Sequence, residues 1–184
     1  MSLRLVRAVA KVENADELHL ARLLVLLRAV DKGKGKTVEG ITKLAKLDFL
    51  LRYPNCLERV LAKTGKDPSA ADIKEYERDS IETKMIRFRY GPWDERYRRW
   101  IALLHAKGLV NTFVQGRTVH VGLTDKGKEI AAQIVSLEDF KDLDLRSGLI
   151  LKSVGLYSAT RLKEFIYQTF PEITNMKWGE KIEL

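Results

Sequence analysis

Residues 107–127 read KGLVNTFVQGRTVHVGLTDKG, and this stretch decides the fold that the sequence predicts. Apolar residues alternate with polar ones on both sides of Gln115 and Gly116, which is the pattern of two short strands joined by a tight turn. Gly116 can adopt the positive φ angle that such a turn requires. Thr124 follows the second strand and can cap a helix that runs past Ile130. The stretch therefore predicts a β-hairpin followed at once by a helix.

The segment in front of the hairpin has the spacing of a helix that is capped by Asp94 and ends at Lys107. A helix, a hairpin and a second helix in this order are typical of the second half of a winged helix-turn-helix domain. We therefore expect a mainly α chain of the α+β class. It divides into a winged-helix domain at residues 1–136, with an insertion at about residues 66–90, and a C-terminal helical extension at residues 137–184.

Three helices are expected before the insertion. The first spans residues 16–30, and its middle is apolar on every face, so it must be surrounded by its own domain or by a partner. Enclosure by its own domain is the favoured interpretation. The second spans about residues 38–53 and ends at Pro54, which cannot continue a helix, and a short third helix covers residues 56–61.

The spacing of apolar residues changes along the insertion, from a loop through a helical pattern to a strand pattern. Residues 66–72 predict a loop and residues 73–83 a polar helix. Residues 85–90 alternate apolar and basic side chains, which is typical of a strand with one buried face, and Gly91–Pro92 is expected to break that strand.

The C-terminal extension begins with an acidic connection that contains Asp142 and Asp144. Residues 145–155 are apolar enough to pack as a helix. Ser158 then caps a helix that ends before Pro171, and residues 178–182 are expected to close the chain as a strand.

The composition indicates a folded protein with an excess of positive charge. The 184 residues are 45% hydrophobic and 32% charged, and the formal net charge is +8. Excess Lys and Arg favours polyanions, because binding releases the cations condensed on phosphate backbones, although a basic balance can also serve solubility alone. The single cysteine, Cys56, excludes an internal disulfide. The sequence has no signal-peptide pattern and no run of 18 apolar residues, so a cytoplasmic protein without a membrane span is expected.

No catalytic or metal-binding motif is recognisable. Residues 35–37 (Gly-Lys-Thr) resemble the end of a phosphate-binding loop, but Val30 stands where that loop needs Gly, and a helix precedes it. The histidines His19, His105 and His120 lie on separate predicted elements, and none is followed by a second ligand three or four residues later in the chain. The sequence therefore predicts a protein with no active site, no metal and no cofactor.

Basic and aromatic residues are interleaved from Lys84 to Trp100. On a helical wheel Tyr97, Trp100, Ile101 and Leu104 form a buried face that arginines flank. In a winged helix the helix before the hairpin enters the major groove, where arginines meet phosphates or base edges. The alternative is a solvated arginine face, or one that binds an acidic protein surface. The candidate DNA-binding residues are Arg87, Arg89, Arg96, Arg99, Lys107 and Arg117, and a candidate basic loop holds Lys32, Lys34 and Lys36.

Three stretches resemble one protein family: KLDFLLRYP at residues 46–54, RFRYGPWD at 87–94, and FIY at 165–167 with FPE at 170–172. Together with the hairpin they are similar to the small middle component of bacterial three-component ABC-ATPase defence systems of the Lamassu type. The resemblance covers about residues 15–175. It implies a non-catalytic accessory subunit that bridges an SMC-like coiled-coil ABC ATPase, double-stranded DNA and an effector, often a nuclease, in anti-phage defence.

Two questions stay open at this point. The insertion departs from the simplest winged-helix order, so the helix at about residues 94–107 could face DNA or dock on the ATPase. The alternative function is a free-standing winged-helix transcriptional regulator, which would usually dimerise to match a two-fold operator. A neighbouring gene for a coiled-coil ATPase would favour the accessory subunit.

Overall fold

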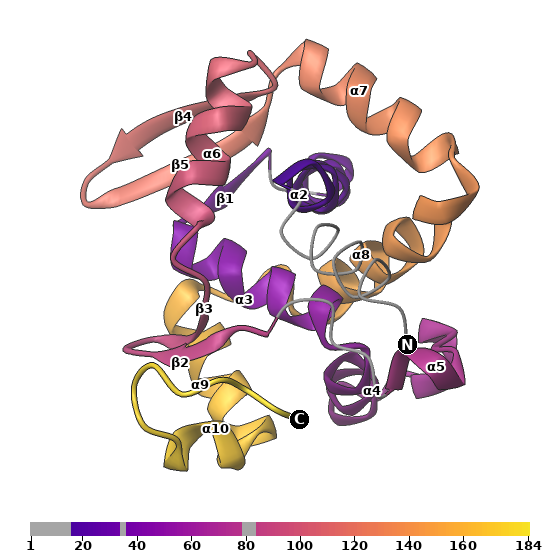
Figure 1. The fold of residues 1–184 in the computed structure, drawn as a ribbon, viewed down its shortest axis with the longest axis vertical. Helices are drawn as coiled ribbons and strands as arrows, with labels where there is room; N and C mark the ends of the chain where they lie inside the picture. Colours follow the sequence, from indigo (N-terminus) through magenta and orange to yellow (C-terminus); the bar gives the residue numbers. More distant parts are fainter. Residues whose placement is uncertain (1–15, 34–35, 79–83) are drawn as a thin grey trace, which may run out of the picture.

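Helix α2 (Asp16–Lys32) runs through the middle of the molecule, seen end-on in Figure 1 with the other elements around it. The computed structural model describes residues 16–33, 36–78 and 84–184. The side chains from Leu23 to Leu27 are all buried, because neighbouring helices and strands cover every face of α2. The predicted enclosure of this apolar helix by its own chain is confirmed.

A three-stranded antiparallel sheet lies beside α2. It contains β1 (Thr37–Glu39), β4 (Val110–Gln115) and β5 (Thr118–Leu123) in the order β1-β5-β4. The hairpin predicted from the sequence is confirmed: Gln115 pairs with Thr118 across a turn in which Gly116 has a φ of 61°.

Strand β1 corrects the prediction of a helix that starts near Val38. Val38 is buried and pairs with Val121 of β5, so residues 37–39 belong to the sheet. Gly40, with a φ of 103°, turns the chain out of the strand, and α3 (Ile41–Arg52) begins after it.

Helix α4 (Pro54–Lys63) follows α3 almost without a connection. Pro54 occupies the first helical position, where its missing N–H has no partner to lose. The third predicted helix is therefore present and extends further at both ends than residues 56–61.

The insertion differs from its prediction. The predicted loop at 66–72 contains the short 3-10 helix η1 (Pro68–Ala71), and within the described part of 73–83 only α5 (Glu75–Arg78) is helical. Residues 79–83 lie outside the described residues. Strand β2 (Ile86–Phe88) pairs with β3 (Gly91–Trp93), so Gly91–Pro92 forms a second strand where a break was expected.

The buried face expected for residues 85–90 is also wrong. Phe88 and Tyr90 are 43% and 47% exposed, because the two-stranded β2–β3 ribbon lies on the surface with that edge uncovered. Helix α6 (Tyr97–Ala106) then begins at Tyr97. Asp94 was predicted to cap this helix, yet its carboxylate instead accepts a hydrogen bond from the Arg96 N–H in the turn before it.

The end of α6 and the start of the next helix follow the prediction. Gly108, with a φ of 69°, leads from α6 into β4. Thr124 caps α7 (Asp125–Ser136), and its Oγ1 accepts a hydrogen bond from the Gly127 N–H at 2.9 Å.

The C-terminal part is helical, as predicted, with different boundaries. It contains η2 (Glu138–Phe140), α8 (Lys141–Val154), α9 (Ala159–Thr169) and α10 (Pro171–Asn175). Asp142 and Asp144 lie in the first turn of α8, where carboxylates favour the helix N-terminus, so they belong to a helix and not to a linker. Ser158 caps α9, as predicted. The expected closing strand is reduced to one bridge between Ile86 and Lys181.

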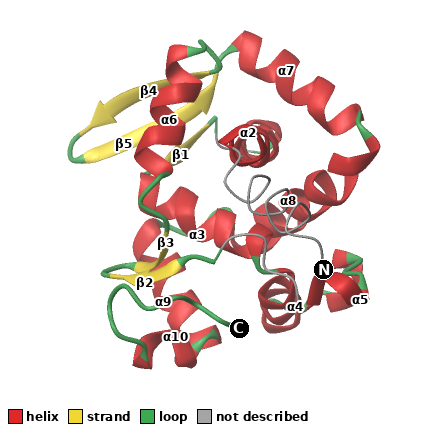
Figure 2. Ribbon diagram, in the orientation of Figure 1, coloured by secondary structure: helices red, strands yellow, loops and turns green. Residues whose placement is uncertain are grey.

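The C-terminal helices share the hydrophobic core of the rest of the chain. Ile150 of α8 and Ile166 of α9 are fully buried in the same cluster as Leu23 of α2 and Leu44 of α3. Figure 2 shows the result, a mainly helical α+β structure with a small antiparallel sheet. Among the described residues, no helix combines the length and the apolar character that crossing a membrane demands.

Candidate functional site

The inner face of α6 is the one that the helical wheel predicts. Tyr97, Trp100, Ile101 and Leu104 are all buried in the core. The Tyr97 and Trp100 rings meet edge to face at 5.3 Å between centroids. The opposite side of α6 is therefore the side available for binding. Whether an arginine can bind a ligand depends on its position around this helix.

Arg96 is held by its own neighbourhood. Its Nε and Nη2 donate to the two carboxylate oxygens of Asp94 at 3.0 and 2.7 Å, and its guanidinium lies 4.8 Å from the centre of the Trp100 ring. Burial alone would raise the pKa of the Asp94 carboxyl, but the hydrogen bonds from Arg96 and the charge of Arg52 outweigh it and lower the pKa to about 2. The Arg96 side chain is therefore engaged in contacts that stabilise the fold, and it is less available to a ligand than a free arginine.

Arg99 is bound more loosely. Its Nη2 donates to Asp16 Oδ2 at 2.5 Å, while the side chain remains 66% exposed. Trp100 Nε1 donates to the other oxygen of Asp16 at 2.9 Å, which keeps that carboxylate in place. An exposed ion pair of this kind contributes roughly 0–1 kcal/mol to stability. Replacing Asp16 by a phosphate as the partner of Arg99 therefore costs little free energy.

The outward face of α6 carries a cation that the predicted set left out. Arg98 is exposed, and its side chain has neither an ion pair nor a hydrogen bond to another described residue. Ala102 and Ala106 on this face are small and exposed, so a ligand can come close to the helix. Arg98 was part of the arginine run in the sequence, and its position on the wheel outside the buried face of Tyr97, Trp100, Ile101 and Leu104 was the signal that could have singled it out.

Lys107 and Arg117 lie at the two ends of β4. Lys107 is exposed at the end of α6, and its carbonyl oxygen accepts a hydrogen bond from Lys126 Nζ at 3.0 Å. Arg117 is exposed in the hairpin turn. On the outward face of the hairpin Phe113 stacks on His120 at 4.7 Å between ring centroids, which leaves an aromatic surface next to the turn.

Arg87 and Arg89 lie apart from α6, on the β2–β3 ribbon beside α9. The Arg87 guanidinium stands 5.7 Å from the centre of the Tyr167 ring of α9 and donates to its neighbouring Phe88 carbonyl. Arg89 stands 5.3 Å from the Tyr90 ring. The structure thus divides the predicted arginines between two surfaces that different elements carry.

The predicted basic loop is only partly visible. Lys32 ends α2, and Lys36 is exposed just before β1. Lys34 lies outside the described residues.

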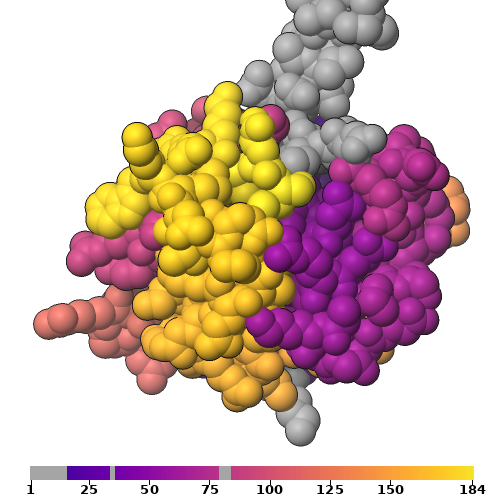
Figure 3. Space-filling model, turned by 90° about the horizontal axis from the view of Figure 1, so that it is seen from below, coloured from indigo at the N-terminus to yellow at the C-terminus, as the bar shows by residue number. Residues whose placement is uncertain are grey.

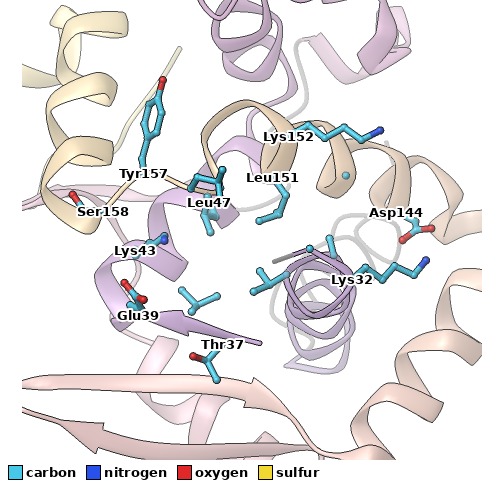
Figure 4. Close-up of a pocket in the computed structure, with 17 residues that line it drawn as sticks. Lys32, Thr37, Glu39, Lys43, Leu47, Asp144, Leu151, Lys152, Tyr157 and Ser158 are labelled. Carbon is cyan, nitrogen blue, oxygen red and sulfur yellow. The ribbon is translucent and has the colours of Figure 1, made fainter. Parts of the chain in front are cut away.

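A pocket of about 680 Å³ opens between the end of α2, β1, the start of α3, and α8 (Figure 4). Its floor is apolar and includes Val38 and Leu47. Lys43 lines it at 9% exposure, and burial lowers the pKa of this lysine, although the charge of Glu39 partly offsets the effect. The pocket mixes charges of both signs and borders the basic loop through Lys32 and Gly33.

Within the described part of the chain, the cysteine and histidine side chains, which often serve in catalysis or metal binding, do not line this pocket. The Cys56 thiol is buried, and burial raises its pKa to about 12, which makes it a poor nucleophile. Across the described ranges, no cluster of three His, Cys, Asp or Glu side chains could hold a metal ion.

Comparisons of the chain with protein-family models, with curated proteins and with solved structures found no significant match.

Proposed function

We propose that the part of the chain up to residue 136 forms a winged-helix module that binds double-stranded DNA with the outer face of α6 and the β4–β5 hairpin. The observation that carries the proposal is the order of elements. With α4, η1, α5 and the β2–β3 ribbon left out, the elements run in the order α2, β1, α3, α6, β4, β5, which is the order of a winged helix, and β5 lies between β1 and β4 in the sheet. In that arrangement α6, directly before the hairpin, is the helix that enters the major groove.

The insertion is compatible with this arrangement. In Figure 1 α5, which belongs to the insertion, and α4, which precedes the insertion, lie on the far side of α3 from α6 and the hairpin. They therefore leave the outer face of α6 clear.

The charge of the side chains supports the same surface. Arg98, Arg99, Lys107 and Arg117 are exposed along α6 and the hairpin. Phosphate contacts from four cations would release about four condensed counterions and give a log–log salt slope near −3 to −4. Asn and Gln are absent from α6, so contacts with the phosphate backbone fit better than readout of bases.

We propose further that the chain acts without catalysis, as an accessory subunit that joins an SMC-like coiled-coil ABC ATPase, DNA and an effector in anti-phage defence. The sequence resemblance supports this part. So does a pair of exposed aromatic residues away from α6: the Phe88 ring on the β2–β3 ribbon lies tilted against the Trp178 ring at 6.0 Å between centroids, and Trp178 is 64% exposed. Exposed aromatic groups are typical of protein interfaces. The apolar helix α2 gives no evidence for a partner protein, because the chain itself buries this helix.

The DNA part is tested with a charge-reversal pair. The affinity of Arg98→Glu with Arg99→Glu for a DNA duplex is measured by fluorescence anisotropy over a range of salt concentrations. We expect at least tenfold weaker binding and a salt slope smaller by about two. The matched control reverses two exposed cations elsewhere, Lys152→Glu with Arg161→Glu, and should keep the slope. Unchanged affinity and slope in the α6 pair would remove this helix from the DNA surface.

The partner part is tested by co-expression with a coiled-coil ATPase encoded next to this chain. We expect the two proteins to copurify, and Phe88→Ser with Trp178→Ser to weaken that association. Failure to copurify would overturn the accessory role. Light scattering would then separate the alternative, because a free-standing regulator is expected to be a homodimer.

A further inference from the structure

Two lysines from distant parts of the chain meet in a small pocket. Lys46 of α3 and Lys163 of α9 line a cavity of about 220 Å³ between α3, the turn of the β2–β3 ribbon and α9. Figures 1 and 3 both show the β2–β3 ribbon next to α9. The other lining residues are polar or small and include no carboxylate: Thr42, Tyr90, Ala159 and Thr160.

The positive charge in this pocket has no counter-ion within the described part of the chain. Lys46 is 2% exposed, and its Nζ donates to the Thr42 carbonyl oxygen at 3.0 Å. No carboxylate of the described residues lies within 4 Å of either ammonium group. A buried ammonium without an opposite charge costs free energy, because no carboxylate replaces its lost hydration.

The two lysines also act against each other. Burial first, and then the charge of Lys163, lower the pKa of Lys46 to about 8. Within the described part of the chain the buried arginines are arranged otherwise: Arg22, Arg52 and Arg146 each have a carboxylate within hydrogen-bonding distance. The Lys46–Lys163 pair therefore lacks the carboxylate partner that a buried ion pair of the fold would have.

The pocket offers further donors beside the ammonium groups. Ala159 and Thr160 form the first turn of α9, whose first backbone N–H groups have no acceptor inside the helix. The cap residue Ser158 accepts from Arg161 N–H, which leaves the amides nearer the helix start for a ligand. Helix N-termini favour anions through their amides and their dipole. Thr42, Tyr90 and Thr160, which also line the pocket, each carry a hydroxyl group.

We propose that this pocket binds a phosphate group, either as the free ion or as the phosphate of a small phosphorylated molecule, between Lys46, Lys163 and the start of α9. A phosphate dianion matches the two ammonium charges and has several acceptor oxygens for amide and hydroxyl donors. Lys46 is too deeply buried for the backbone of a duplex to reach it. The site uses other elements than α6 and the β4–β5 hairpin, so it stands independently of the proposed DNA surface.

Calorimetric titration with inorganic phosphate and with a nucleoside monophosphate tests the proposal, with the unphosphorylated nucleoside as blank. We expect one saturable site per chain. Tighter binding of inorganic phosphate would assign the free ion, and tighter binding of the monophosphate a small phosphorylated ligand. Lys163→Gln should weaken binding at least tenfold, because it removes one charge-assisted contact. The matched control Lys152→Gln, which removes an exposed lysine of α8, should leave binding unchanged.

Amide NMR spectra give a second measurement that does not depend on substituting the buried Lys46. Phosphate should shift the Ala159 and Thr160 amide signals, and in Lys163→Gln those shifts should need at least tenfold more phosphate. The proposal is overturned if neither probe binds saturably, if the shifts occur elsewhere, or if a DNA duplex produces the same shifts in place of phosphate.

Discussion

The Asp48 carboxylate of α3 is fully buried and accepts two hydrogen bonds from Arg22 of α2, from Nε at 2.6 Å and from Nη2 at 3.0 Å. Tyr97 of α6 donates to the same carboxylate at 2.6 Å, and Arg52 lies 4.0 Å away. Burial alone would raise the pKa of Asp48, but the charge and hydrogen bonds of Arg22, the charge of Arg52 and the hydrogen bond from Tyr97 outweigh it and lower the pKa. One carboxylate therefore connects α2, α3 and α6.

Asp48→Asn should destabilise the fold strongly. The amide removes the negative charge and leaves Arg22 and Arg52 buried beside a neutral group, and breaking a buried pair in this way costs about 3–5 kcal/mol. Equilibrium unfolding in urea gives the free energy. The control is Asp144→Asn, since Asp144 accepts from Arg28 Nη1 at 2.9 Å in a partly exposed pair. That change should cost less than about 1 kcal/mol, and equal losses in the two variants would contradict the role given to Asp48.

Stability should rise with pH above neutrality because of Lys46. Its pKa is about 8 in the folded protein against 10.5 in the unfolded chain. Between these values the unfolded chain binds more protons, so raising the pH favours the folded state, by about 1 kcal/mol between pH 7 and 9. Lys43, whose pKa burial also lowers, adds a change of the same sign.

Urea unfolding at several pH values measures the Lys46 effect. The rise should end near pH 9, because burial raises the pKa of Cys56 to about 12 and the unfolded chain then loses the thiol proton first. Lys46→Met should flatten the rise. A variant with the pH profile of the parent protein would show that Lys46 stays fully charged in the fold.

Gly127→Ala should be destabilising, because α7 begins in contact with the backbone at the start of β4. A Cβ on Gly127 would come within 1.9 Å of the Leu109 carbonyl oxygen, so one element would have to move. Overpacking of this kind costs about 1–3 kcal/mol or more. Gly148 of α8 is the matched control, since a Cβ there meets nothing within 4 Å. Gly148→Ala should gain about 0.5–1 kcal/mol from the higher helix propensity of Ala. Thermal unfolding of both variants checks the opposite signs.

The parts of the fold that the sequence predicted are those with local causes. Gly116 and Thr124 act within a turn and a cap, so their neighbours in the chain were sufficient to place the hairpin and α7. Strand β1 has no such cause. Its three residues are extended because β5 offers an edge to pair with, and Val38 is buried only through that pairing. Read alone, Val38 fits the helical spacing of the residues after it.

The candidate site shows the same division between local and distant causes. The wheel of α6 placed its aromatic face correctly, since that depends on spacing alone. It could not show that Asp16, 83 residues away, would pair with Arg99, or that Arg52 would share Asp94 with Arg96. The meeting of Lys46 and Lys163 depends in the same way on how α9 packs against α3.

Arg117 and Arg96 were predicted for the same role, and the structure separates them. Arg117 is exposed in the hairpin turn, so Arg117→Ala should keep the unfolding free energy and reduce the salt slope of duplex binding by about one. Arg96 holds Asp94 through two side-chain hydrogen bonds, so Arg96→Ala should cost about 1–3 kcal/mol of stability. It should also bring the pKa of Asp94 up from about 2, so the variant unfolds at a higher pH than the parent protein when acid is added. Duplex titrations and acid unfolding of the two variants should therefore give opposite patterns. If Arg96→Ala lost one unit of salt slope without losing stability, Arg96 would be a DNA contact and its pairing with Asp94 would be incidental.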